Sequence, residues 1–288
     1  MSEETSVVVV GGGIVGTATA YQLTDRGIDT VLVDDDREGS ATAAGAGIVS
    51  PPASSRREND DWFAFAQLAA AHYPELIEDL ETAGIENHGY KQGEMLSVAL
   101  TPAEAETIET DRERAQRRDA TVEAITPAEA EAAFPGLSSV ERAIRLPDAG
   151  RVDGAMLTDA LDRAARDAGL TTVDGRVTAI RTDDGAVSGV VVDGSDRIDA
   201  ERVVVAGGAW SGGFGDDLGC SLPVHPIRGQ IIHLDGSDVF ENPAELPIVG
   251  SVSDHYIVPW ADGRIVVGAT REDDAGFDPR ITAEGVQE

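Results

Sequence analysis

Continuous apolar runs, separated by polar turns, mark the first elements of the chain. The β-branched run Ser6–Val10 predicts a strand that is buried on both faces. Ile14–Arg26 is typical of a helix, and Gly27 follows it as a stop signal. Thr30–Val33 predicts a second buried strand, so the three elements together predict one βαβ unit.

Helices and short strands alternate through the middle of the chain. The predicted helices are Asp61–Thr82, Pro102–Arg118, Pro127–Phe134 and Asp153–Ala168. The second and third of these follow a threonine at the N-cap and begin with a proline, which favours helix initiation. The predicted strands are Glu94–Leu100, Ala143–Leu146, one around Val173, Arg176–Arg181, Ala186–Val192, Arg197–Ile198 and Val203–Ala206.

The end of the chain is expected to be mostly strand. Pro223–Leu234, His255–Trp260 and Arg264–Gly268 alternate well enough to predict a meander. Ala261-Asp262-Gly263 has the composition of a hairpin turn between the last two strands. No internal repeat and no low-complexity linker interrupts the pattern.

A glycine motif follows the first predicted strand and opens the first predicted helix. It consists of Gly11-Gly12-Gly13-Ile14-Val15-Gly16, and Asp34 ends the next strand. Gly11 allows a tight turn, Gly13 allows the backbone to approach a pyrophosphate, and Gly16 allows close packing of helix on strand. The free N–H groups of the helix N-terminus attract phosphate. This arrangement predicts a dinucleotide site, and the alternative is a glycine-rich turn without a ligand.

Residues after Asp34 separate this chain from a plain NAD-binding domain. Such a domain would return at once to another parallel strand, whereas Gly39–Ser55 is rich in Gly, Ala and Ser, which suggests a backbone close to a ligand. Asp34 can accept both ribose hydroxyls, and the carboxylates of Asp35 and Asp36 disfavour a cofactor with a 2′-phosphate. The late buried run Val203–Ala206 favours FAD over NAD.

The charge balance of the chain limits the classes of partner that we expect. The formal net charge is −31, and Lys91 is the only lysine. Such a field repels nucleic acid and anionic membrane surfaces, so we expect neither as a partner. The acidic residues are scattered, which favours adaptation to high salt, where counterions screen the repulsion. An ordinary acidic cytosolic protein is the alternative.

Other features of the sequence limit the class of protein further. Cys220 is the only cysteine, so the chain has no intrachain disulfide and no cysteine metal cluster, and its histidines lack metal-ligand spacing. Val7–Val10 is too short for a signal peptide or a membrane span. We therefore expect a soluble, cytoplasmic protein without a metal site. A homo-oligomer or a partner subunit stays open.

Markers in a fixed order resemble the FAD-dependent D-amino-acid oxidase and glycine oxidase superfamily. They begin with Val7–Asp34 and extend along nearly the whole chain. The resemblance implies that Ala43, Ala44, Gly45, Gly47 and Ile48 run beside the flavin ring, within the segment Ala43-Ala44-Gly45-Ala46-Gly47-Ile48. It also implies that the backbone at Arg176-Val177 meets adenine, and that Val203–Ser211, with Ala206, Gly207 and Trp210, is a second flavin-contacting strand and turn. Further markers are Ile227-Arg228-Gly229-Gln230, Tyr256-Ile257-Val258-Pro259 and Val267-Gly268-Ala269-Thr270.

The resemblance also implies the fold and the domains. It predicts an α/β protein with an FAD-binding Rossmann-like domain of the glutathione-reductase type and an α+β substrate domain with an antiparallel sheet. We expect the FAD-binding domain at residues 1–55 and 140–220, and the substrate domain at 56–139 and 221–288. The cofactor-binding set includes Gly11, Gly13, Ile14, Val15, Gly16, Asp34, Asp35 and Val177.

The activity implied is oxidation of a C–H bond beside an amine, with hydride transfer to flavin N5. Substrates of this kind are glycine, a D-amino acid or a sarcosine-like amine, and Tyr256 is the catalytic candidate that steers the substrate. The alternative for Tyr256 is a half-buried strand tyrosine without a role. Alternatives for the chain are a dehydrogenase subunit with a quinone or other acceptor, or an inactive remnant.

Members of the resembled family continue beyond the last residue of this chain. The continuation contains an arginine that pairs with the substrate carboxylate and a glycine-rich segment that closes over the flavin. We therefore expect the 288 residues alone to turn over amino acids poorly or not at all. Arg271 or Arg228 is the remaining candidate for a substitute anchor.

Overall fold

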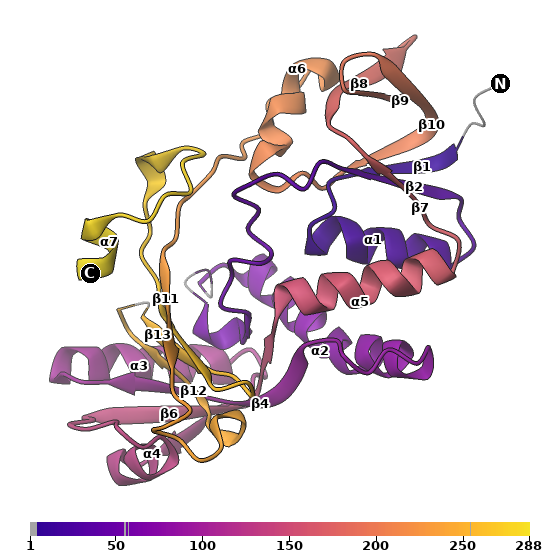
Figure 1. Ribbon diagram of the computed structural model, residues 1–288. Coiled ribbons are helices and arrows are strands. Elements are labelled where there is room, and N and C mark those ends of the chain that lie inside the picture. The colour runs from indigo at the N-terminus through magenta and orange to yellow at the C-terminus, as the bar shows by residue number, and fades with distance from the viewer. Residues whose placement is uncertain (1–4, 55, 57, 254) are drawn as a thin grey trace.

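A computed structural model describes residues 5–54, 56, 58–253 and 255–288. Two sheets organise the chain (Figure 1). The six-stranded sheet has the order β7-β2-β1-β10-β9-β8, in which β1, β2, β7 and β10 are parallel and β9 and β8 continue antiparallel. Its strands are β1 (Thr5–Val10), β2 (Thr30–Asp34), β7 (Thr171–Asp174), β8 (Val177–Asp183), β9 (Ala186–Val192) and β10 (Asp196–Val205).

The valines of β1 alternate between the two faces of this sheet, and both faces are buried. Val7 and Val9 pack against α1 (Ile14–Asp25) and α5 (Gly154–Asp167). Val8 and Val10 face a second cluster that includes Phe214 of the turn η2 (Gly208–Phe214), which leads into α6 (Gly215–Leu218). A continuous β-branched run is needed here because neither face meets water. The predicted βαβ unit is confirmed.

The second sheet of the structure has eight strands. Its order is β11-β14-β13-β12-β4-β6-β3, and β5 pairs with β6. The strands are β3 (Ile48–Val49), β4 (Tyr90–Ala99), β5 (Glu123–Ile125), β6 (Arg142–Val152), β11 (Ile231–Asp235), β12 (Ile248–Ser251), β13 (Tyr256–Pro259) and β14 (Arg264–Gly268). Helices α3 (Pro102–Gln116) and α4 (Pro127–Ala133) pack on it, whereas α2 (Asp60–Thr82) runs from its side to the core cluster of α1 and α5. Short 3₁₀ turns are η1 (Pro51–Ala53), η3 (Pro243–Glu245) and η4 (Asp273–Ala275).

Helix starts follow the local sequence closely. Thr101 and Thr126 each accept a hydrogen bond from the backbone N–H of a glutamate three residues later, and each glutamate side chain accepts one from the threonine backbone N–H. These capping boxes, with proline at the first helical position, satisfy backbone N–H groups that have no partner within the helix. The predicted helix starts at Pro102 and Pro127 are confirmed.

β6 is longer than the predicted Ala143–Leu146. It continues through Pro147 to Val152, and the register with β4 shifts between Gly93 and Met95. This bulge accommodates the extra residues around Pro147, which cannot donate a ladder hydrogen bond. The strand reaches back to pair with β3, so sheet pairing places residues 142–152 in the second sheet, beyond the predicted domain boundary at 140.

Other differences arise from long-range pairing. The predicted strand Pro223–Leu234 is wrong over residues 223–230, because only Ile231–Asp235 is strand and the prolines before it cannot join a ladder. Arg197–Ile198 and Val203–Ala206 are parts of one strand, β10, which pairs with β9 and then with β1. β12 was not predicted. β12, β13 and β14 do form a meander, with β11 added outside β14.

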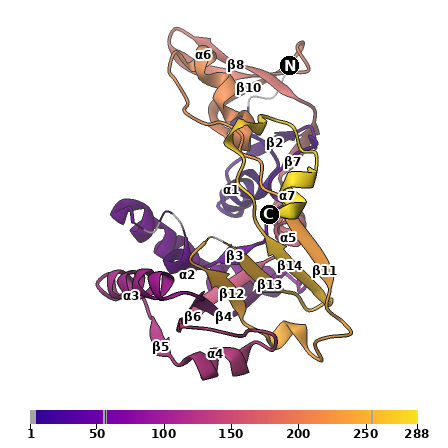
Figure 2. The ribbon, with the colours of Figure 1, turned by 90° about the vertical axis from the view of Figure 1, so that its left-hand side faces the viewer.

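The last segment returns from the second sheet to the first. We call residues 269–288 the C-terminal arm, which ends in α7 (Ala283–Gln287) and rises from β14 to the level of the six-stranded sheet in both views (Figures 1 and 2). Phe277 of the arm stacks on Trp210, with ring centroids 5.2 Å apart. None of the described helices is long and apolar enough to cross a membrane.

Candidate functional site

The glycine turn lies at the carboxyl end of β1. The Gly11 N–H donates to the Val33 carbonyl over 2.8 Å, and its φ of +105° is in the region that favours glycine. A Cβ on Gly11 would press on the Ala206 carbonyl, and one on Gly16 would overlap the Gly11 carbonyl. The turn therefore holds the start of α1 against the two central strands.

The first turn of α1 has no side-chain cap of its own. Gly13 is the N-cap residue, and Ile14 N–H donates to Thr42 Oγ1 over 3.0 Å. Val15 is 67% exposed, so this helix end opens to solvent. Sequence analysis missed Thr42, although it directly precedes the Ala43-Ala44-Gly45 marker. Its hydroxyl brings that segment to the N-terminus of α1.

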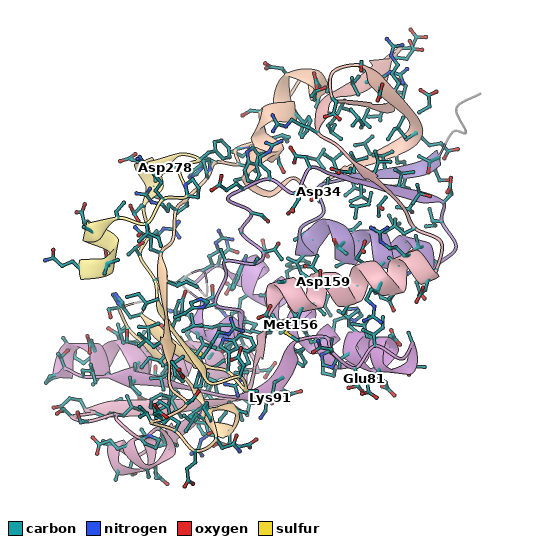
Figure 3. All side chains as sticks on the ribbon, in the orientation of Figure 1. Asp34, Glu81, Lys91, Met156, Asp159 and Asp278 are labelled. Atoms are coloured by element: carbon teal, nitrogen blue, oxygen red, sulfur yellow. The ribbon has the colours of Figure 1, made fainter. Side chains whose placement is uncertain are left out.

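Asp34 and Asp35 follow β2 but have different surroundings. Asp34 lies at the carboxyl end of β2 (Figure 3), and a Cβ on Gly12 would meet its side chain. Asp35 Oδ2 accepts hydrogen bonds from Arg176 Nε at 2.8 Å and from Arg37 Nη2 at 2.9 Å. Burial works against ionisation of Asp35, but the hydrogen bonds from both arginines outweigh it and lower its pKa.

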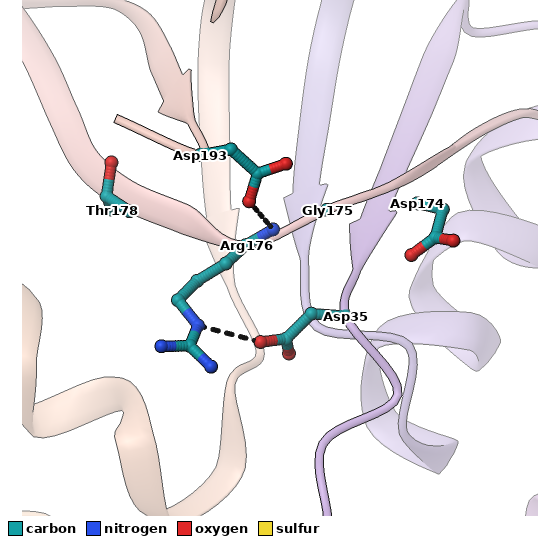
Figure 4. Close-up of a pocket in the computed structure, with 6 residues that line it drawn as sticks. All are labelled: Asp35, Asp174, Gly175, Arg176, Thr178 and Asp193. Carbon is teal, nitrogen blue, oxygen red and sulfur yellow. Dashed lines mark hydrogen bonds and ion pairs between the residues drawn. The ribbon is translucent and has the colours of Figure 1, made fainter. Parts of the chain in front are cut away.

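An open cavity of about 630 Å³ lies beside Asp35 (Figure 4). Its lining residues are Asp35, Asp174, Gly175, Arg176, Thr178 and Asp193. Arg176 crosses it to reach Asp35, while Asp193 Oδ1 accepts the Arg176 N–H. Val177 comes directly after this cavity as the first residue of β8, and its side chain is buried.

The second predicted turn lies beside the glycine turn. Ala206 N–H donates to the Val10 carbonyl over 2.8 Å, so Ala206 and Gly207 follow β10 next to Gly11. Trp210 lies between the Arg37 guanidinium, 4.8 Å from its ring centre, and Phe277. The structure thus brings three separate segments of the chain together around this indole ring.

The segment Ala43–Ile48 passes from the first sheet toward the second. Ala43, Ala44 and Gly45 are exposed, whereas Ala46 is buried. Gly47 has a φ of +73° and lies against the Val152 carbonyl, where no side chain fits. Ile48 then begins β3 and pairs with Arg151 of β6.

Tyr256 faces the same apolar cluster as that segment. It packs with Ala46 and Ile48 in one hydrophobic cluster of the second sheet. On β13 it pairs with Gly250 of β12 and Gly268 of β14, and a Cβ on Gly268 would lie 3.2 Å from the Tyr256 hydroxyl. Burial raises the pKa of Tyr256, so its hydroxyl stays protonated at neutral pH.

The two candidate arginine anchors are elsewhere engaged. Arg228 donates to Glu272 Oε2 at 2.6 Å and to the Asp278 carbonyl, within the C-terminal arm. Arg271 is exposed, 3.9 Å from Asp273. Among the described residues, no group of three or more His, Cys, Asp or Glu side chains could hold a metal ion.

The comparisons decide the family. Residues 6–288 match the protein family described as FAD dependent oxidoreductase. The chain belongs to this family. FAD-dependent oxidoreductases of known structure share its fold, so the predicted fold class is confirmed: an FAD-binding, Rossmann-like part and an α+β substrate part. The sheet of the substrate part is mixed rather than antiparallel as predicted, because β12 pairs in parallel with β4.

Several FAD-dependent oxidoreductases and relatives resemble the chain over almost all of its length. An uncharacterized oxidoreductase, YurR, of Bacillus subtilis is 35% identical over 98% of this chain and 76% of its own length. Glycine oxidase of Pseudomonas putida is 30% identical over 98% of this chain and 74% of its own. The crystal structure of iminodiacetate oxidase from Chelativorans sp. BNC1 superposes with a TM-score of 0.86, at 34% identity, covering 98% of this chain and 76% of that one.

FAD is the cofactor of this family, and the residues of the glycine turn fit it. At Gly13 a Cβ would lie 3.0 Å from Thr42 Oγ1, so an added side chain would fill the space before the first turn of α1. The N-terminus of α1 points to the same space, and a helix N-terminus suits a pyrophosphate. The predicted cofactor class is therefore confirmed, while the individual contacts stay predictions.

Proposed function

We propose that the chain oxidises the CH–NH bond of a small amino acid or amine. The observation that supports this most is the shared apolar cluster of Tyr256 with Ala46 and Ile48. It connects Tyr256 through one apolar cluster with the segment that we propose to run beside the flavin ring. Glycine oxidase and iminodiacetate oxidase among the relatives add support for an amine substrate.

We propose that the ADP half of FAD lies along Gly11, Gly13 and Gly16, with Asp34 accepting from the ribose. The flavin half would then follow Ala43–Ile48 toward the second sheet. FAD, when bound, supplies N5 as the acceptor of the hydride that leaves the α-carbon. We also propose that the two sheets with their helices are the cofactor-binding and substrate domains, with the boundary after Val152 rather than at 140.

In this proposal the residues of the chain orient the substrate and exclude water. Burial keeps the Tyr256 hydroxyl protonated, so it can donate to a substrate carboxylate. Gly268 leaves room for that hydroxyl beside β14, and the apolar cluster excludes competing water. Such orientation is worth more than any single contact, because a displacement of about 1 Å can cost about a hundredfold in rate.

The test is anaerobic reduction of the FAD-loaded protein by a panel of amines. The panel contains glycine, sarcosine, iminodiacetate and D-alanine, with lactate as a hydroxy-acid control. Bleaching of the flavin by an amine but not by lactate is the expected result. Reduction by lactate but by none of the amines would contradict the proposed substrate class.

A further inference from the structure

One carboxylate connects the two sheets at the end of β6. Asp153 is the N-cap of α5, and its Oδ1 accepts the Met156 N–H over 3.1 Å. Its other oxygen, Oδ2, accepts from Arg264 Nη2 over 3.0 Å. Since α5 packs on the six-stranded sheet and Arg264 begins β14 of the eight-stranded sheet, the ion pair joins the two.

On one side of this pair, the neighbours of Asp153 hold residues Ala43–Ile48, which we call the flavin segment. Val152 N–H donates to the Gly47 carbonyl over 2.8 Å. Gly154 lies so close to the Thr42 carbonyl that a Cβ would collide with it. Thr42 in turn accepts from Ile14 at the start of α1. A shift of Asp153 therefore moves the backbone at 42–47.

On the other side, Arg264 belongs to the hairpin that contains Tyr256. Its guanidinium also donates from Nε to Asp262 within the hairpin turn over 2.7 Å, and it lies 5.5 Å from the centre of the Trp260 ring. Trp260 N–H donates to the Arg264 carbonyl over 2.8 Å, and β13 and β14 are paired as far as Tyr256 and Gly268. The hairpin can thus transmit the position of its turn to Tyr256.

We propose that Asp153 and Arg264 are positioning residues that fix Tyr256 relative to the flavin segment. The proposal rests on the proposed function of Tyr256. The side chains are 19% and 36% exposed, so solvent screens the pair and it contributes little to stability. Catalysis is far more sensitive to position, because reacting groups must be held within a fraction of an ångström. The sequence gives no sign of this pair, since the partners are far apart in the chain.

The experiment compares Arg264→Gln with Asp262→Asn in FAD-loaded protein. Arg264→Gln removes the link between the sheets, whereas Asp262→Asn removes only the local charge pair and keeps an oxygen for the turn. We expect Arg264→Gln to lower the limiting rate of flavin reduction by about tenfold or more, with FAD affinity and Tm near wild type. Asp262→Asn should stay within about twofold of wild type.

A double-mutant cycle shows whether the two residues act as a pair. Asp153→Asn keeps a capping oxygen but loses the charge, and its effect on the rate should not multiply with that of Arg264→Gln. Multiplicative effects, or an Arg264→Gln protein that reduces its flavin like wild type, would overturn the proposal.

A second readout separates this proposal from the proposed function. The visible circular dichroism of bound FAD needs no substrate, and we expect Arg264→Gln, but not Asp262→Asn, to change it. If lactate but no amine reduces the wild-type flavin, the proposed function fails while this signal still tests the positioning. An unchanged signal in Arg264→Gln would count against the pair by itself.

Discussion

A side chain added at Gly13 should disturb cofactor binding without disturbing the fold. A valine there meets Thr42 Oγ1 and the space before α1, but no core residue. We expect Gly13→Val to lower FAD affinity at least about a hundredfold, equivalent to about 3 kcal/mol. Isothermal titration of apoprotein with FAD measures this, with far-UV circular dichroism to show that the fold persists.

Gly93→Ala is the matched control, since a Cβ on Gly93 meets no atom within 4 Å. It should bind FAD like wild type. Undiminished affinity in Gly13→Val would show that the pyrophosphate lies elsewhere.

A substitution of Tyr256 should affect substrate binding more than the catalytic rate. Tyr256→Phe keeps the ring in its cluster but removes the protonated hydroxyl. We expect KM for the best amine to rise about tenfold and kcat to fall by less. A tenfold change is equivalent to about 1.4 kcal/mol, which is close to the contribution of one hydrogen bond to a charged group. Steady-state kinetics measures both, and Tyr90→Phe, which lies in the other cluster, should change neither. A fall in kcat alone would argue against an orienting role.

At the scale of elements, the C-terminal arm is held by a compact polar network. Gln230 Nε2 donates to Thr282 Oγ1 at 2.9 Å, Gln230 Oε1 accepts the Thr282 N–H, and Glu272 accepts from Arg228, Gln230 and Thr270. Hydrogen bonds from Arg228 and Gln230 lower the pKa of Glu272 from 4.5 to about 2. The network therefore requires an ionised Glu272.

The pH dependence of stability follows from that shift. A carboxylate with a depressed folded-state pKa stabilises the fold above its ordinary value and loses this effect as pH falls toward about 2. We expect Glu272→Gln to lower Tm at neutral pH and the gap to wild type to close between about pH 4.5 and pH 2. Thermal melts across this range test it against Asp273→Asn as control. A gap that is constant with pH would mean that the network does not depend on the charge.

Elements with local signals could be predicted from the sequence, and those defined by distant partners could not. The βαβ unit, the threonine-proline helix starts and the hairpin turn at Asp262 depend on neighbours within a few residues. β12 is four residues long and pairs in parallel with β4, more than a hundred residues earlier. β6 needed a bulge opposite Gly93 to continue past Pro147. Neither property is present in a local pattern.

At the scale of the whole molecule, the site depends on contacts between segments that are far apart. The glycine turn, Asp34 and Tyr256 were predicted because their residue types are specific to the chemistry or to the family. Thr42 and the pair of Asp153 with Arg264 were missed, because only the folded chain brings them to α1 and to α5. The sequence therefore predicts the residues of the site better than the residues that hold them in position.

The net charge of the whole molecule leads to a prediction about salt. A formal net charge of −31 destabilises the compact state by mutual repulsion when it is not screened. We expect Tm to rise by about 5 °C or more from low to molar potassium chloride, corresponding to ~2 kcal/mol. Sucrose at matched osmolality serves as the control for solvent exclusion. A Tm that does not depend on salt would remove the proposed adaptation to high salt.

The most direct test of this account is the identity of the nucleotide that the protein binds. The apoprotein is incubated with an equimolar mixture of FAD, FMN, NAD and NADP, separated from free ligand, denatured, and its released nucleotide identified by chromatography. We expect FAD alone, and its loss in Gly13→Val. Retention of a nicotinamide nucleotide without flavin would contradict it.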